Sequence, residues 1–113
     1  MQFLLIAYDA KDEHAPQRRL AARERHLAQG PALIAEGKAL FGTAILDDEG
    51  RMIGSMLVRE FPTRTDFDAW LETEPYVTDG VWGDIQVQPC QAGPLFLEAL
   101  GRGLPLRLAD GPG

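Results

Sequence analysis

Cysteine and histidine are both scarce in this sequence. The 113 residues include one cysteine, Cys90, and two histidines, His14 and His26. A single cysteine forms neither an internal disulfide nor a CxxC motif, and the two histidines fit neither HxH nor HExxH. The sequence therefore predicts no metal site and leaves Cys90 as a passive residue at a strand end.

Positive charge is also in short supply. Eleven Lys and Arg residues stand against seventeen Asp and Glu residues, so the formal net charge is −6. Proteins that bind nucleic acid need clustered cations to displace counterions from the phosphates. Four arginines do cluster between residues 18 and 25, but acidic side chains flank them. We therefore predict no nucleic-acid partner.

Long apolar runs are missing as well. The most apolar stretch, residues 3–8 (FLLIAY), is followed at once by Asp9 and Lys11. It is too short for a signal peptide or a membrane span. The sequence also lacks the GxGxxG, P-loop and GxSxG motifs of nucleotide sites and serine hydrolases. We expect a cytoplasmic protein with no membrane contact and no cofactor.

The segments that are present alternate between strand and helix patterns. Residues 1–9 are apolar on both alternating faces, which is typical of a strand covered on both sides. Residues 16–36 have helical periodicity with an interruption at Gly30-Pro31, where we expect a kink or two abutting helices. The other expected elements are two hairpin strands (39–48 and 51–61), a helix that starts near Thr63 and ends before Pro75, and a strand (83–89).

This order, β-α-β-β-α-β, predicts a ferredoxin-like α+β fold. Both helices would cover one face of a four-stranded antiparallel sheet in a domain spanning residues 1–90. The other face would be bare and apolar, so we expect a homodimer in which two sheets pack face to face. Residues 91–113 form an extension rich in Gly and Pro, in which residues 95–100 have the composition of a short docking helix.

His26 is the first candidate for chemistry. Leu20, Leu27 and Ile34 recur every seven residues and form an apolar stripe, which we expect to face the core. Arg19, Arg23 and His26 fall together on the flank of that stripe, so His26 would lie at the edge of the core. There it would serve as a general acid or base. The alternative is a half-exposed helical histidine, and His14 is expected to be a solvated loop residue.

Two further candidate residues lie at the predicted end of the second helix, and a third lies in a predicted strand. Glu74 would face the negative end of the helix dipole, so a partner such as His26 or Arg23 would compensate it; otherwise it is an ordinary surface residue. Tyr76 fills the core or lines a pocket. Ser55 is a small polar residue in the middle of a strand beside Gly54, where it points into a pocket or permits close packing.

Several short motifs in order resemble the YciI-like (YCII-related) family. They are FLLIAYD at the start, RxxHL at 23–27, EGKAL at 36–40, Gly54-Ser55, and EPYVTDGVW at 74–82 followed by IQVQP. The resemblance implies a dimeric α+β barrel and a site built on His26 and Glu74, with Arg23, Ser55 and Tyr76 nearby. The family usually has Asp where this chain has Glu74, and the extra methylene displaces the carboxylate.

The family resemblance also implies a class of reaction. One characterised relative is a dehydrochlorinase that acts on a chlorinated hydroxyhydroquinone. Our first hypothesis is a cofactor-free enzyme in which His26 and Glu74 transfer a proton during elimination, isomerisation or dehalogenation of a small anionic or aromatic molecule, with Arg23 stabilising negative charge. The second is a non-catalytic homodimeric module that binds a small ligand. The third is a structural dimer without a site.

Overall fold

The computed structural model describes residues 1–101, so the end of the predicted Gly- and Pro-rich extension lies outside the described part. Its elements follow the predicted order, with the first helical region divided in two by Gly30-Pro31. They are β1 (Gln2–Asp9), α1 (Ala15–Ala28), α2 (Gly30–Ala35), β2 (Ala39–Leu46), β3 (Met52–Glu60), α3 (Arg64–Leu71), α4 (Pro75–Thr78), β4 (Trp82–Cys90) and α5 (Pro94–Gly101). Cys90 ends β4, as predicted.

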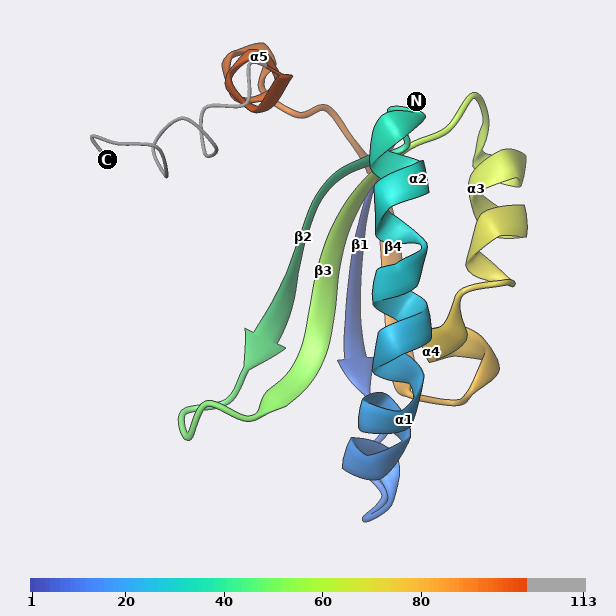
Figure 1. Cartoon of the computed structure of the whole chain (residues 1–113), viewed down its shortest axis with the longest axis vertical. Helices are drawn as coiled ribbons and strands as arrows, with labels where there is room; N and C mark the ends of the chain where they lie inside the picture. The colour runs from blue at the N-terminus through green and yellow to red at the C-terminus, as the bar shows by residue number, and fades with distance from the viewer. Residues whose placement is uncertain (102–113) are drawn as a thin grey trace.

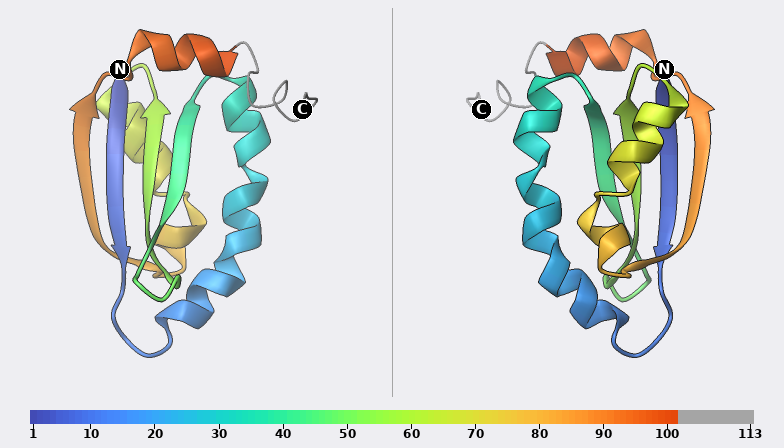
Figure 2. Two further views of the ribbon diagram at one scale, coloured as in Figure 1. Left: turned by 90° about the vertical axis from the view of Figure 1, so that its left-hand side faces the viewer. Right: turned by 90° about the vertical axis from the view of Figure 1, so that its right-hand side faces the viewer.

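The four strands form one antiparallel sheet in the order β2-β3-β1-β4. This is the ferredoxin-like arrangement that the sequence predicts. Helices α1 to α4 cover one face of the sheet, and α1 and α2 run along its β2 edge (Figures 1 and 2). The hairpin between β2 and β3 turns at Gly50, whose φ of +82° lies in the region that glycine adopts without strain.

Alternation along β1 divides its side chains between the two faces. Phe3, Leu5 and Ala7 are buried under the helices, where they join Phe67 and Leu57 in the core. The β1 residues between them point to the opposite face, which helices α1 to α4 leave uncovered (Figure 2). Strand β1 is therefore apolar on both faces, although only one face is buried under the helices.

The prediction that Leu20, Leu27 and Ile34 face the core is wrong. Leu20 is 69% exposed and Ile34 66% exposed, whereas the buried residues of α1 are Ala15, Arg19 and Ala22. Helix α1 approaches the sheet through small side chains and through the one arginine that finds an acidic partner there. A large leucine in place of Ala22 would not fit, because that side chain is fully enclosed.

Helix α5 occupies the predicted docking segment but packs few of its side chains. Leu95, Phe96 and Leu100 remain exposed. The helix lies at the end of the sheet on the side away from α1 to α4 (Figure 1). The connection before it is held to the sheet where the Ala92 amide donates to the Gln2 side-chain oxygen at 2.5 Å.

None of the helices in residues 1–101 combines the length and apolar character needed to cross a bilayer.

Candidate functional site

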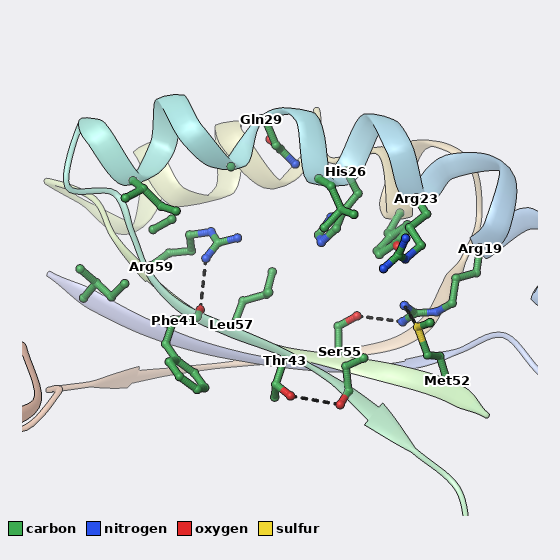
Figure 3. Close-up of a pocket in the computed structure, with 18 residues that line it drawn as sticks. Arg19, Arg23, His26, Gln29, Phe41, Thr43, Met52, Ser55, Leu57 and Arg59 are labelled. Carbon is green, nitrogen blue, oxygen red and sulfur yellow. Dashed lines mark hydrogen bonds between the residues drawn. The ribbon is translucent and has the colours of Figure 1, made fainter. Parts of the chain in front are cut away.

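A cavity of about 360 Å³ lies between the α1–α2 helices and strands β2 and β3 (Figure 3). Its helical wall includes Arg23 and His26, and its sheet wall includes Ser55 and Leu57. Leu27 and Ile34 also line it. The apolar stripe of the first helical region thus partly borders this cavity instead of entering the core.

His26 and Glu74 meet at the cavity wall. Nδ1 of His26 lies 2.5 Å from Oε1 of Glu74, although the two residues are 48 positions apart. The glutamate side chain is fully buried, and that of the histidine is 13% exposed. Because an ionised carboxylate only accepts hydrogen bonds, this contact assigns the proton to Nδ1 and leaves Nε2 unprotonated in the neutral ring. Nε2 makes no hydrogen bond within residues 1–101.

Glu74 is placed differently from the sequence expectation. Helix α3 ends at Leu71, and Glu74 is the N-cap of the short helix α4, where its side chain accepts from the Tyr76 amide. Pro75 does not simply terminate a helix: its fixed φ and missing N–H suit the first position of the next one. The carboxylate therefore caps a helix start and avoids the negative end that we expected.

Gln29 completes the hydrogen bonding of Glu74. Its Nε2 donates to Oε2 of the carboxylate, and its Oε1 accepts from Nε1 of Trp70 at 3.2 Å. The indole N–H can only donate, so it fixes which end of the amide faces Glu74. With His26, Gln29 and the Tyr76 amide as donors, the buried carboxylate has three partners.

Tyr76 supports the face of the imidazole. The two rings are stacked with centroids 4.1 Å apart and planes inclined by 13°. Tyr76 is buried beside the cavity, and this burial raises the pKa of its hydroxyl above the usual value. The phenol therefore stays protonated at neutral pH, so it remains available as a hydrogen-bond donor.

Arg19 packs against the ring of Tyr76. Its guanidinium lies 4.8 Å from the Tyr76 ring centroid and is fixed by a two-pronged ion pair with Asp9, with N–O distances of 2.7 and 3.2 Å. It also donates to Oγ of Ser55 at 2.8 Å. The Ser55 hydroxyl accepts a further bond from Trp82 at 3.2 Å. Ser55 therefore anchors the framework beneath the site as well as lining the cavity.

Arg23 and Arg59 give the cavity its charge. Both line it, and neither forms an ion pair within residues 1–101. The described residues that line the cavity include no Asp or Glu. Its wall is thus cationic in an acidic protein, a contrast that favours anionic ligands.

The structure brings together all five residues singled out from the sequence. His26, Arg23, Ser55 and Tyr76 line the cavity, and Glu74 contacts His26 from behind. The added methylene of Glu74 does not keep its carboxylate from the ring. Sequence reasoning missed the supporting roles of Asp9, Gln29 and Trp70, and it placed Arg19 on the helix flank without assigning it a role. It also missed Arg59, although strand alternation from Ser55 and Leu57 places a charged side chain on the helix-covered face.

A second, open hollow lies at the end of β1, with Tyr8, Lys11, Met52 and Asp84 among its lining residues. It has no histidine, and its Asp9 and Asp12 carboxylates are already paired with Arg19 and Arg18. No group of three or more His, Cys, Asp and Glu side chains placed to hold a metal ion occurs in residues 1–101. The chemistry-bearing groups therefore gather at the first cavity.

Comparison with known proteins assigns the family. The sequence model of the YCII-related domain matches residues 1–91, which include every residue of the site. The chain belongs to the YCII-related family. An uncharacterised protein of Haemophilus influenzae is 32% identical over 95 residues, covering 79% of this chain and 95% of that protein. Protein YciI of Escherichia coli is 30% identical over the same length, with the same coverage.

A solved structure resembles this YCII-related chain in fold and sequence. It is the 5-chloro-2-hydroxyhydroquinone dehydrochlorinase TftG from Burkholderia phenoliruptrix AC1100, in complex with 2,5-dihydroxybenzoquinone. The TM-score is 0.71 at 26% identity, and the match covers 82% of this chain and 96% of the other. Helix α5 lies after the residues that the family model matches.

Proposed function

We propose that this YCII-related protein is a small-molecule enzyme in which His26 transfers a proton and Glu74 orients it. The observation that carries the proposal is the 2.5 Å contact between His26 Nδ1 and a fully buried Glu74 carboxylate, at the wall of a cationic cavity. A carboxylate behind an imidazole fixes the tautomer and stabilises the imidazolium that forms. The similarity to TftG, a dehydrochlorinase, supports small-molecule chemistry at this fold.

The reaction class that we propose is elimination, isomerisation or dehalogenation of a small aromatic or anionic molecule. Nε2 of His26 takes a proton from the substrate, and the electron pair left behind moves into the ring of the substrate. In an elimination, a leaving group such as chloride then departs with its bonding electrons. The imidazolium next returns its proton to solvent or product. Such a positioned base contributes about 10²–10⁴-fold to the rate.

Three other residues would bind the substrate. Arg23 has no carboxylate partner within residues 1–101, so its charge is available for an anionic oxygen that develops during the reaction. Tyr76 would donate a hydrogen bond, since its raised pKa keeps the phenol protonated. Ser55 would contact the substrate from the sheet wall, where the hydrogen bond from Arg19 holds its hydroxyl in place.

The test uses 5-chloro-2-hydroxyhydroquinone as substrate and 2,5-dihydroxybenzoquinone as binding probe. We expect chloride release by the wild type, a loss of about 10²–10⁴-fold in His26→Ala and His26→Gln, and retained binding of the quinone. His14→Ala is the matched control, because His14 is the exposed second histidine. Equal rates for wild type and His26→Ala would overturn the proposed role of His26. Binding without chloride release by the wild type would favour a ligand-binding module.

We also propose that two copies pair through the open face of the sheet. This face has apolar side chains at its centre, because Ile6 of β1 pairs with Met56 of β3. Phe41, on the β2 edge, is 52% exposed. A contiguous apolar sheet face of this kind is rare on a monomer.

A further inference from the structure

Arg59 is a buried cation that forms no ion pair within residues 1–101. It is 7% exposed on β3, and its Nε has no hydrogen-bond partner in the described chain. Nη1 contacts the carbonyl oxygens of Phe41 and Val58, both at 3.3 Å. Nη2 makes no hydrogen bond in residues 1–101. Burial of a guanidinium without an ion pair is costly. Here burial lowers the pKa of Arg59, and the charge of the Glu74 carboxylate offsets this effect only in part.

Arg19 has an ion pair that Arg59 lacks. Both arginines are buried and both line the cavity, but Arg19 has Asp9 at 2.7 Å. Arg59 has no carboxylate within ion-pair distance; besides two carbonyl oxygens it has the ring of Trp70, at 5.2 Å from its guanidinium carbon. A buried arginine usually has a carboxylate or phosphate on its fork, because its donors are rigid and directional. The Nε–Nη2 edge of Arg59 lacks this partner.

Arg59 and Arg23 lie at different places along the cavity, on either side of His26 (Figure 3). In Figure 3 Arg59 lies on one side of His26, and Arg23 lies on the other side, with Leu57 on the sheet wall below. The two arginines without ion pairs therefore bracket the imidazole. A cavity of about 360 Å³ is large enough for a substituted benzene ring between them.

We propose that Arg59 binds a carboxylate on the substrate, so that the preferred ligands are small aromatic acids with a second anionic group directed at Arg23. The carboxylate accepts from Nη2, while Nε stays enclosed by the protein. This holds the ring across the cavity with its reacting position under Nε2 of His26. This inference rests on the proposed function, in which His26 transfers a proton. It adds the class of substrate, which His26 and Glu74 alone do not specify.

The experiment measures binding of three probes of the same ring size to the full chain by calorimetry. Terephthalate has two carboxylates, terephthalamate has one carboxylate and one neutral amide, and benzoate has one carboxylate. We expect the wild type to bind terephthalate about ten- to a hundredfold more tightly than the other two. In Arg59→Gln this preference should fall to less than about threefold, while affinity for benzoate, held by Arg23, should stay within a similar factor.

Two variants separate loss of the site from loss of the fold. Arg59→Lys retains the charge but not the planar guanidinium, so it should keep part of the preference. Arg51→Gln is the matched control, since Arg51 is exposed on the hairpin and should leave the preference unchanged. A full preference in Arg59→Gln, an equal loss for all three probes, or no binding of terephthalate to the wild type would overturn the assignment. These binding results do not depend on turnover, so failure of chloride release would count only against the catalytic proposal.

Discussion

The imidazole of His26 stacks on the phenol ring of Tyr76 at a centroid distance of 4.1 Å, with the ring planes inclined by 13°, while its Nδ1 edge contacts Glu74. One contact fixes the plane of the ring and the other fixes its rotation within that plane. Together they leave Nε2 without a protein partner in the described chain. A base that is held in this way loses little entropy when a substrate binds, which is the structural basis of an oriented proton acceptor.

The first prediction concerns the length and charge of residue 74. Glu74→Gln retains the size of the side chain but presents an amide to Nδ1 and removes the negative charge behind the ring. We expect chloride release to fall by about 10²–10⁴-fold. Glu74→Asp keeps the charge but withdraws it by one methylene, so we expect a smaller loss. The rates of both variants, measured against 5-chloro-2-hydroxyhydroquinone, test this order; a faster Glu74→Gln than Glu74→Asp would contradict it.

The second prediction concerns the buried ion pair. The side chains of Arg19 and Asp9 are 6% and 9% exposed, so Asp9→Asn leaves a guanidinium in the protein interior without its countercharge. We expect this change to lower the free energy of unfolding by about 3–5 kcal/mol. Asp68→Asn, which breaks the exposed pair with Arg64, should cost less than about 1 kcal/mol. Urea denaturation of the two variants provides the comparison, and equal losses would show that the Arg19 pair is not structurally important.

The third prediction concerns alkaline pH. Burial raises the pKa of Tyr76 above its usual value of 10.0, so the folded state holds this proton more tightly than the unfolded state. The associated stability is fully present below pH 10 and is lost as pH rises through the folded pKa. We expect the free energy of unfolding to fall more steeply above pH 10 in the parent than in Tyr76→Phe.

Cys90 has to be removed before this measurement. Burial also raises the pKa of its thiol from 9.0, so its titration overlaps the same range. Both proteins should therefore carry Cys90→Ser. Identical slopes with and without the Tyr76 hydroxyl would contradict the prediction.

The fourth prediction concerns the open face of the sheet. Met56→Glu places a charge beside Ile6 in the middle of this face, so the mass in solution should fall from a dimer to the 12.4 kDa of one chain. Leu20→Glu is the control, because Leu20 is exposed on the helical side. Light scattering after gel filtration measures both. A monomeric wild type, or dissociation caused by the Leu20 change alone, would exclude pairing through the sheet.

Local sequence patterns determined most of the fold. The alternation in β1, the turn at Gly50 and the Gly30-Pro31 interruption each act over a few residues, and the structure has an element or boundary at each of them. Helical periodicity did not correctly predict which side chains of α1 face the core. Periodicity identifies the apolar side of a helix, but it does not show whether the facing sheet has room for leucine. Here that space admits Ala22 and Arg19.

The candidate site depended on longer-range information. Family motifs pointed to His26 and Glu74, yet nothing in the local sequence showed that Gln29 and Trp70 would support the carboxylate, because the N–H of Trp70 and Oε1 of Gln29 come from residues 41 positions apart. The sequence alone determined the order of strands and helices, since each depends on neighbouring residues. The tertiary structure alone decided which charges are paired and which, such as Arg59, are not, since that depends on side chains from distant segments sharing one buried space.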